Sequence, residues 1–281
     1  MEEKMKIITW NVNRFNGTSQ CDIWMEARKR YLKEVYKYIE EQQIGKDDIV
    51  LLQEVPSDME WQDVIKENYE ILSWYDDNEK FIHDKSDIDK SDIDITIENR
   101  NSRFRSQTIA IVSKESNWEL KKFNEAINFG KEGDKFNYVN KYVQLIYEKI
   151  ELLGIHMPVR NTVKDKPDLG IKDLVNAFNN ANCIPHIIMG DLNAGDYEKE
   201  DECRDFQENR NNYNEFVKKY GYEDAIKNVK TTNYHAPTEI DHVLIKKDSI
   251  YKDSSYIPEM QKVDYKELSD HYPIIVNMKK Y

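Results

Sequence analysis

The sequence contains no long apolar segment and little cysteine. No hydrophobic run approaches the ~20 residues needed to cross a bilayer, and residues 1–6 lack the apolar core of a secretory signal. The three cysteines are an odd number without CxxC spacing, which argues against a disulfide framework and against a thiolate zinc site. We therefore expect a cytoplasmic protein that does not insert into membranes.

Positive charge is also in short supply. The chain carries 41 Lys and Arg against 53 Asp and Glu, which gives a formal net charge of -12. No overall positive field attracts nucleic acid or an anionic membrane, so binding of a polyanion would require a local basic face. An acidic cleft is nevertheless compatible with a divalent-cation enzyme, because a bound metal offsets the carboxylates where the substrate binds.

The overall composition is that of a globular chain. Hydrophobic residues make up 39% and charged residues 33% of the 281 positions, a balance that supports a packed core and argues against wholesale disorder. This length allows one large domain or two small ones. Because no Pro, Gly or Ser-rich linker and no shift in composition divides the chain, we predict a single domain over residues 1–281.

One segment, residues 76–98, departs from this composition. It is dense in Asp and contains the five-residue sequence Lys-Ser-Asp-Ile-Asp twice in tandem, at residues 85–89 and 90–94. The alternating Ile residues are compatible with a surface hairpin. Acidic and repetitive runs of this kind are more often solvated, so we predict an inserted acidic loop.

Short runs rich in β-branched residues recur along the whole chain, and segments with helical spacing of apolar residues separate them. The runs predict buried strands at residues 6–10, 48–53, 108–113, 142–147, 152–156, 186–190, 240–245 and 272–277. The helical spacing predicts helices at residues 22–43, 171–180 and 206–220. This mixture is typical of an α/β or α+β fold with many strands.

Polar residues follow the first two of these runs. Asn11 and Asn13 come at the end of the first run, where an Asn pair by itself usually indicates a turn. Glu54 closes the apolar run at residues 49–52. A charged Glu at the end of a buried strand is costly unless it is paired or binds a cation, so Glu54 is a candidate ligand.

A second polar motif, Gly190-Asp191-Leu192-Asn193, follows the run at residues 186–190. Side chains two apart on a strand point the same way, so Asp191 and Asn193 can offer one carboxylate and one amide to the same cleft. As an isolated tetrapeptide, the motif is equally compatible with a helix cap or an Asx turn.

Three histidines lie beside predicted strands. Asp241-His242 and Asp270-His271 each lead a C-terminal strand, and an Asp beside a His in this position suggests an oriented imidazole with a metal or base role. His156 ends the strand at residues 152–156, where a lone histidine is more often a core residue with satisfied hydrogen bonds.

The order of these motifs resembles the endonuclease/exonuclease/phosphatase superfamily over residues 7–276. The resemblance implies a four-layer α/β sandwich in which two mainly antiparallel sheets are flanked by helices. It also implies hydrolysis of a phosphate ester with Mg²⁺ or Mn²⁺ as cofactor. Carboxylate and amide oxygens agree independently with a hard octahedral cation, whereas zinc would require more His or Cys.

The same resemblance implies a metal site and departs from one subfamily. Glu54 would be the main metal ligand, with Asn11 and Asp270 as further ligands. Abasic-site enzymes carry Asp where this chain has Asn13, which argues against two metals and against abasic-specific action.

The resemblance assigns catalytic roles to five other residues. Asp191 would orient or deprotonate the attacking water, and Asn193 would hold the phosphate or that water. His271 would contact the scissile phosphate or act as general base, with Asp241 fixing its tautomer. His156 matches the second histidine of deoxyribonuclease-I-like members, whereas we expect His242 to be structural or to support the site residues without contacting the substrate.

Three functions remain open at this stage. Hydrolysis of phosphodiester bonds in nucleic acid is favoured by the DNase-like position of His156. Hydrolysis of a small phosphorylated molecule or a lipid headgroup fits the acidic balance slightly better, although the sequence has no amphipathic membrane-binding stretch. A catalytically inactive binding protein is disfavoured because Glu54, Asp191 and His271 are all present. We predict a nuclease with nucleic acid as its substrate.

Overall fold

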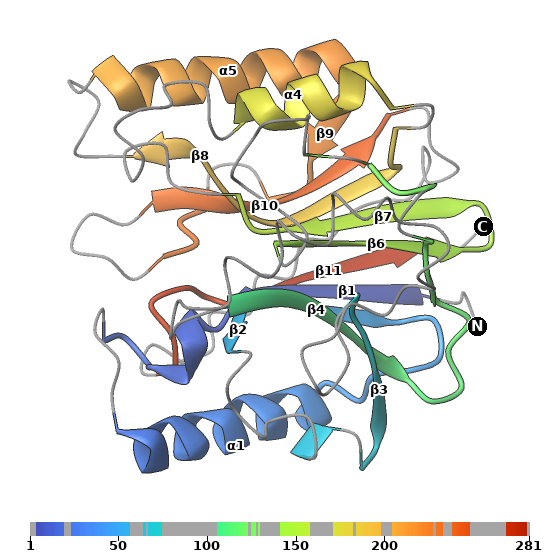
Figure 1. Ribbon diagram of the computed structural model, residues 1–281, viewed down its shortest axis with the longest axis vertical. Helices are drawn as coiled ribbons and strands as arrows, with labels where there is room; N and C mark the ends of the chain where they lie inside the picture. Colours follow the sequence, from blue (N-terminus) through green and yellow to red (C-terminus); the bar gives the residue numbers. More distant parts are fainter. Residues whose placement is uncertain are drawn as a thin grey trace, which may run out of the picture.

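The computed structural model describes residues 4–19, 24–56, 64–65, 67–74, 106–122, 125–127, 129, 141–157, 171–181, 184–197, 204–226, 229–232, 238–247 and 268–279. The acidic segment 76–98 lies outside these residues, so the loop predicted there stays a prediction. The described residues form four layers, in which two sheets face each other and helices cover both outer faces (Figure 1). The predicted four-layer sandwich is therefore confirmed.

Both sheets are mainly antiparallel, and each contains one parallel pair of strands. The first sheet has the order β11 (Ile274–Lys279), β1 (Lys4–Asn11), β2 (Ile49–Pro56), β4 (Ser106–Ser113) and β3 (Tyr69–Leu72). The second has the order β5 (Glu119–Leu120), β6 (Tyr142–Tyr147), β7 (Ile150–Ile155), β8 (Ile187–Tyr197), β10 (Thr238–Lys246) and β9 (Tyr222–Asp224). The parallel pairs are β1 with β2 and β7 with β8.

The parallel pairs require crossover connections, which explains where the helices lie. Helix α1 (Met25–Glu41) follows the short 3₁₀ helix η1 (Asn13–Phe15) and joins β1 to β2, and α4 (Ile171–Asn179) joins β7 to β8. Helix α5 (Arg204–Tyr220) packs beside α4 on the outer face of the second sheet, whereas α1 covers the first (Figure 1). Within the described ranges, no helix is long and apolar enough to cross a membrane.

The parallel pairing decides where the polar strand ends meet. Asn11 is opposite Gln53 in the register of β1 and β2, so Glu54 follows at the same edge. In the second sheet, Gly154 is opposite Met189, which brings the end of β7 next to the residues that follow Met189 in β8. Both sheets therefore present their polar motifs at strand ends that lie side by side.

The inner faces of the two sheets share one apolar core. Buried residues from the first sheet, including Leu51, pack in the same cluster as Leu152 and Met189 from the second. The sheets pack closely at Gly154, where an added Cβ would lie 2.2 Å from Leu51 Cδ1. Glycine at this position therefore lets a Leu of the facing sheet fill the space between the layers.

All eight predicted strands and all three predicted helices are present, and all ends but one differ from the prediction by at most three residues. The exception is β8, which continues seven residues beyond its predicted end, so that Asp191 and Asn193 lie within the strand and do not follow it. Three short strands, β3, β5 and β9, were not predicted. They have two to four residues each and lie at or next to sheet edges, where pairing with a longer neighbour defines them and local alternation is too brief to detect.

We expect Gly154→Ala to destabilise the protein by about 1–3 kcal/mol, because the new methyl group overpacks the core against Leu51. Chemical denaturation of Gly154→Ala, Leu51→Ala and the double variant checks this. The combined loss should be smaller than the sum of the single losses, since the smaller residue 51 makes room for the methyl group. Additive losses would show that the sheets do not meet at this pair.

Candidate active site

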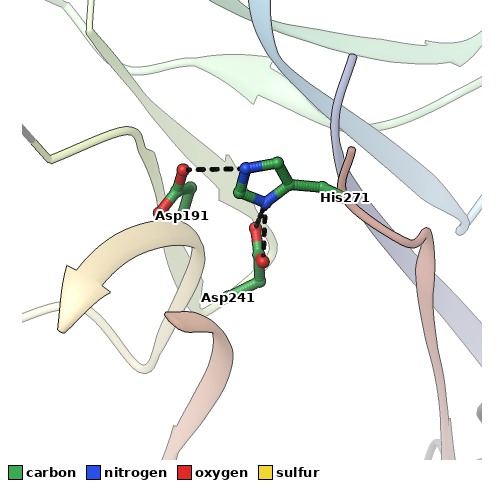
Figure 2. Close-up of side chains that lie close together, drawn as sticks. All are labelled: Asp191, Asp241 and His271. Atoms are coloured by element: carbon green, nitrogen blue, oxygen red, sulfur yellow. Dashed lines mark hydrogen bonds and ion pairs between the residues drawn. The ribbon is translucent and has the colours of Figure 1, made fainter. Parts of the chain in front are cut away.

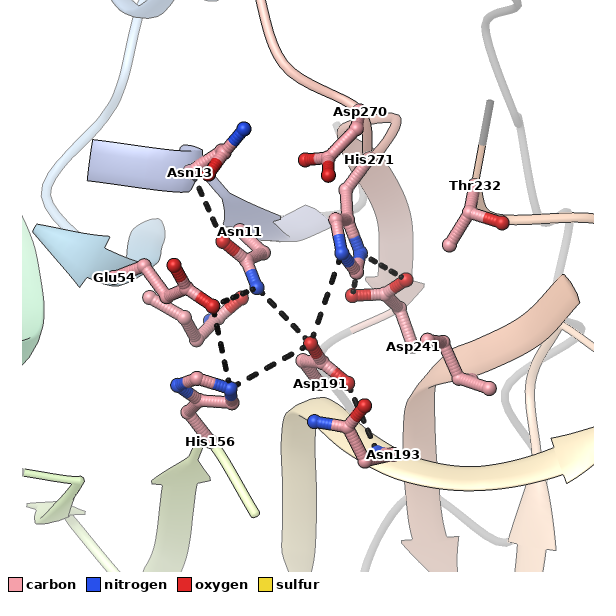
Figure 3. Close-up of polar contacts among 12 residues, drawn as sticks. Asn11, Asn13, Glu54, His156, Asp191, Asn193, Thr232, Asp241, Asp270 and His271 are labelled. Atoms are coloured by element: carbon pink, nitrogen blue, oxygen red, sulfur yellow. Dashed lines mark hydrogen bonds and ion pairs between the residues drawn. The ribbon is translucent and has the colours of Figure 1, made fainter. Parts of the chain in front are cut away.

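The eight residues singled out from the sequence border one site at the strand ends (Figure 3). They come from six segments and from both sheets, and they are Asn11 of β1, Glu54 of β2, His156 after β7, Asp191 and Asn193 of β8, Asp241 of β10, and Asp270 and His271 before β11. Hydrogen bonds and close polar contacts connect seven of them into one network. Asp270 lies at the edge of this network, where Ser269 Oγ donates a 3.4 Å hydrogen bond to it.

The backbone at this site is unusual. Glu54, Asn193 and Asn13 have positive φ values of 55°, 46° and 42°, which L-residues adopt at an energetic cost. The ladder between β2 and β4 shifts register between Leu52 and Val55, so Glu54 leaves the regular sheet. Strained residues of this kind cluster at functional sites, where the surrounding structure holds a side chain in a required direction.

Asn11 connects the carboxylates of the two sheets. Its Nδ2 donates to Asp191 Oδ2 at 3.0 Å and to Glu54 Oε1 at 3.3 Å. Its Oδ1 accepts a 3.0 Å hydrogen bond from the backbone N–H of Asn13, which fixes the orientation of the amide. One side chain of the first sheet therefore places its amide between one carboxylate from each sheet.

His271 lies between two carboxylates (Figure 2). Its Nδ1 is 2.9 Å from Asp241 Oδ2, and its Nε2 is 3.8 Å from Asp191 Oδ2. Burial would lower the pKa of His271, but the charges of Asp241, Asp191 and Asp270 outweigh it and raise the pKa to about 10. The ring is therefore an imidazolium at neutral pH, with its charge held by Asp241.

Asp191 is, like Asp241, almost fully buried in the network. Burial raises its pKa, and the nearby charge of Asp241 raises it further, whereas His271 and the hydrogen bonds from Asn11 and Asn193 act in the opposite direction. The backbone N–H of Asn193 donates to Asp191 Oδ1 at 2.9 Å. A carboxylate with a raised pKa can accept a proton near neutral pH.

His156 faces the same cluster as a neutral ring. Its Nε2 is 3.5 Å from Glu54 Oε1 and 3.8 Å from Asp191 Oδ2. Burial and the nearby ammonium of Lys141 lower its pKa to about 3, although Glu54 acts in the opposite direction. Its Nδ1 is buried without a hydrogen-bond partner in the described part of the chain.

Two cations beside Glu54 were missed by sequence reasoning. Arg14 Nε lies 3.8 Å from Glu54 Oε2, and Lys141 Nζ donates a 3.0 Å hydrogen bond to Ser106 Oγ. Burial would raise the pKa of Glu54, but the two imidazoles, His156 and His271, and the charge of Lys141 hold it below its usual range. No sequence signal marks Arg14 or Lys141, because single basic residues next to strands are common on any surface.

The segment that carries His271 is tied to β1. Trp10 Nε1 donates a 3.0 Å hydrogen bond to the backbone oxygen of His271, and Ser269 Oγ donates a 2.7 Å hydrogen bond to the backbone oxygen of Asn11. Both contacts are buried. Residues more than 250 positions apart thus form one rigid edge, so the distance between Asn11 and His271 does not depend on a loop.

Comparison with known proteins decides the family. The profile of the Endonuclease/Exonuclease/phosphatase family matches residues 8–271. The chain belongs to this family. No curated protein sequence matches significantly. Enzymes of the endonuclease/exonuclease/phosphatase family hydrolyse phosphoester bonds and generally use a divalent metal.

Solved structures share the fold at low sequence identity. D. rerio TDP2 complexed with a single-strand DNA product has 15% identity and a TM-score of 0.57, with 99% of this chain and 100% of that chain covered. An AP endonuclease from Archaeoglobus fulgidus has 14% identity and a TM-score of 0.60, with 97% and 98% covered. The human Nocturnin catalytic domain has 13% identity and a TM-score of 0.58, with 98% and 93% covered.

The donor set of the site fits a divalent cation of this family. Within the described residues, Glu54 accepts one 3.3 Å hydrogen bond from Asn11, pairs with Arg14 Nε at 3.8 Å and lies 3.5 Å from the neutral ring of His156, so its oxygens keep lone pairs available. Asp270 is half-buried, and it accepts a long hydrogen bond of 3.4 Å from Ser269 Oγ. The Glu54 and Asp270 carboxylates are hard ligands that suit Mg²⁺ or Mn²⁺, and Asn11 Oδ1 keeps a second lone pair beside the hydrogen bond that it accepts from the Asn13 N–H.

We expect the His271 imidazole of the metal-free protein to keep both N–H protons up to about pH 10, because its pKa is raised to about 10. Asp241→Asn removes the charge at Nδ1 and should lower this pKa by roughly one to three pH units. A ¹⁵N NMR titration of the imidazole signals measures the pKa of His271 in the wild type and in Asp241→Asn, with His186, directly before β8, as an internal control. An unchanged pKa in Asp241→Asn would show that Asp241 does not hold the charge of His271.

Proposed function

We propose that the protein is a Mg²⁺- or Mn²⁺-dependent phosphodiesterase that hydrolyses nucleic acid by in-line attack of water. The observation that carries the proposal is the continuous network in which Asn11 links Glu54 to Asp191 while Asp191 and Asp241 hold the imidazolium of His271. The network combines a carboxylate with free lone pairs for a cation, Glu54, with a buried base, Asp191, and a fixed positive charge, His271. Hydrolysis of a phosphodiester needs these three groups within a few ångströms of one another.

The metal would be held by Glu54, Asn11 and Asp270. When bound, Mg²⁺ or Mn²⁺ supplies a Lewis acid that offsets the charge developing on the phosphate oxygens. Because these ligands border Asp191 and His271, a phosphate attracted by the cation would lie next to the two side chains that supply the proton chemistry.

The charge of each remaining side chain determines its role in the proposed mechanism. Asp191 orients the attacking water and accepts its proton, because burial raises its pKa towards neutral pH. His271 donates a hydrogen bond from Nε2 to a phosphate oxygen, since a ring that stays protonated cannot act as the base. His156 offers a neutral ring on the other side of Asp191, and Asn193 holds the Asp191 carboxylate through its backbone N–H.

A nucleic-acid substrate is supported by two observations. Arg14 and Lys141 place positive charge beside Glu54 in a chain of net charge -12, which gives a polyanion a local point of attachment. The structural neighbours include a TDP2 bound to single-strand DNA and an AP endonuclease.

The net charge of -12 favours a second candidate, a phosphatase or phosphodiesterase for a small phosphorylated molecule or a lipid headgroup. The same site would serve it, because the chemistry at phosphorus is shared. A cytoplasmic location and a single domain over residues 1–281 also stay predictions from the sequence.

We expect Glu54→Gln to lower cleavage by about 100-fold or more, because the amide removes the charged ligand of the cation. The assay follows supercoiled plasmid, single-stranded DNA and RNA with Mg²⁺, Mn²⁺ or a chelator, and the chelator should abolish cleavage by the wild type. The matched control is Glu70→Gln, which makes the same change at an exposed position of β3.

Equal cleavage by Glu54→Gln and wild type would remove Glu54 from the metal site. No cleavage of any polymer by folded wild-type protein that binds Mn²⁺, together with release of phosphate from small phosphate esters, would favour the second candidate.

A further inference from the structure

A second buried Asp–His pair lies behind the proposed active site. His242 Nδ1 is 2.7 Å from Asp224 Oδ2, and both residues are buried. Tyr213 donates a 2.7 Å hydrogen bond from its hydroxyl to the same carboxylate oxygen, and its ring stacks on the imidazole at a centroid distance of 4.4 Å. The proposed mechanism uses none of these three residues.

The contacts of His242 define its protonation state. Nδ1 faces the carboxylate of Asp224, and Nε2 lies 2.6 Å from the backbone oxygen of Ala194. Both partners are acceptors, so both ring nitrogens must carry protons. Burial would lower the pKa of His242, but Asp224 outweighs it and raises the pKa. The pair is therefore a buried imidazolium and carboxylate.

This arrangement excludes a second metal site at the same place. Asp224, Glu239 and His242 place one ligand atom each within 4.8 Å of one another. A metal requires an imidazole nitrogen with a free lone pair, whereas both nitrogens of His242 are engaged as donors. The cluster is therefore better explained by the hydrogen bond from His242 to the Ala194 carbonyl.

The Ala194 carbonyl belongs to the segment that shapes the active site. Next to it, Asn209 Nδ2 donates a 2.6 Å hydrogen bond to the backbone oxygen of Asn193. Two consecutive carbonyls are therefore fixed from behind the site. Gly195 makes this approach possible, because a Cβ there would lie 2.0 Å from Glu239 O and 3.0 Å from His242 Nε2.

Fixing these carbonyls fixes Asn193, which has a positive φ of 46°. Its backbone N–H donates to Asp191 Oδ1, and its side chain donates a 2.6 Å hydrogen bond from Nδ2 to the backbone oxygen of Met157. The Asn193 N–H lies in the peptide that precedes Asn193, whereas Asn209 and His242 hold the two peptides that follow it. Without these two anchors, rotation about φ and ψ of Asn193 would relax the strained residue and turn the preceding peptide, with its N–H, away from Asp191.

We propose that His242, charged by Asp224, is a positioning residue that holds the Ala194 carbonyl and thereby keeps the Asn193 N–H on the carboxylate of Asp191. The inference rests on the proposed function, in which Asp191 accepts the proton of the attacking water. It adds to that function a buried contact on the far side of β8 that determines how the base is oriented.

The test compares two double variants that differ only in which contact they keep. In Asp224→Asn/His242→Gln, the Gln amide can still reach the Ala194 carbonyl. In Asp224→Asn/His242→Asn, the shorter amide can reach residue 224 but leaves the carbonyl without its donor. Both variants are neutral at this pair, so neither leaves a buried charge unpaired.

We expect kcat of the Asn variant to fall on the order of 10- to 100-fold below that of the Gln variant, with KM within about threefold, because the defect misplaces a reacting group. The second readout is the hydrogen-exchange rate of the Asn193 amide by NMR, which needs no catalytic activity. It should rise in the Asn variant and stay near the wild-type value in the Gln variant.

Equal kcat and equal Asn193 exchange in the two variants, with an active wild type, would overturn the inference and leave the proposed function intact. Faster Asn193 exchange in the Asn variant of a protein that cleaves no phosphodiester would support the positioning contact and refute the proposed function. If the Asn variant does not fold, Asp224→Leu/His242→Met replaces it, since an apolar pair of similar volume also lacks the donor. It should show the same loss of kcat and the same faster exchange.

Discussion

The hydrogen bond from Asn11 to Asp191 joins the two sheets at the edge where the titratable groups of the site meet. Its length of 3.0 Å depends on the sheets being packed at a fixed separation, which Gly154 permits by admitting Leu51 between the layers. It also depends on the parallel pairs, because β1 with β2 and β7 with β8 each bring two carboxyl ends to one edge. The geometry of the site therefore depends on the packing between the sheets, and a change in that packing would alter the position of Asp191.

Charge balance is the second constraint. Glu54, Asp191, Asp241 and Asp270 converge on a volume in which His271 is the buried imidazolium and His156 is neutral. Burial raises the pKa of Asp191 and of Asp270, and a cation bound among these carboxylates would lower the cost of ionising them. In the proposed function, Mg²⁺ or Mn²⁺ would supply that cation. The raised pKa of Asp191 is the part of this cost that catalysis can use, because it makes the carboxylate a better base.

Much of the fold could be predicted from the sequence, because the long strands carry apolar runs that are informative without tertiary context. The strands β3, β5 and β9 could not, since pairing with a neighbour defines them. The order of polar motifs at strand ends predicted which side chains would meet. It could not predict that Glu54 and Asn193 have positive φ, nor that Arg14 and Lys141 lie beside Glu54, because these features arise from the way separate segments pack. The roles of these side chains in catalysis stay a proposal.

Strand β10 shows how one short segment can serve both faces of a sheet. Asp241 and His242 are adjacent, and neighbouring side chains on a strand point to opposite faces. Asp241 therefore pairs with His271 in the site while His242 pairs with Asp224 behind it. In the proposed mechanism, the first pair holds the group that contacts the phosphate, and the second holds the backbone that orients Asp191. Because a one-residue slip of β10 would exchange the two faces, the register of this strand and the geometry of the site are specified by the same contacts.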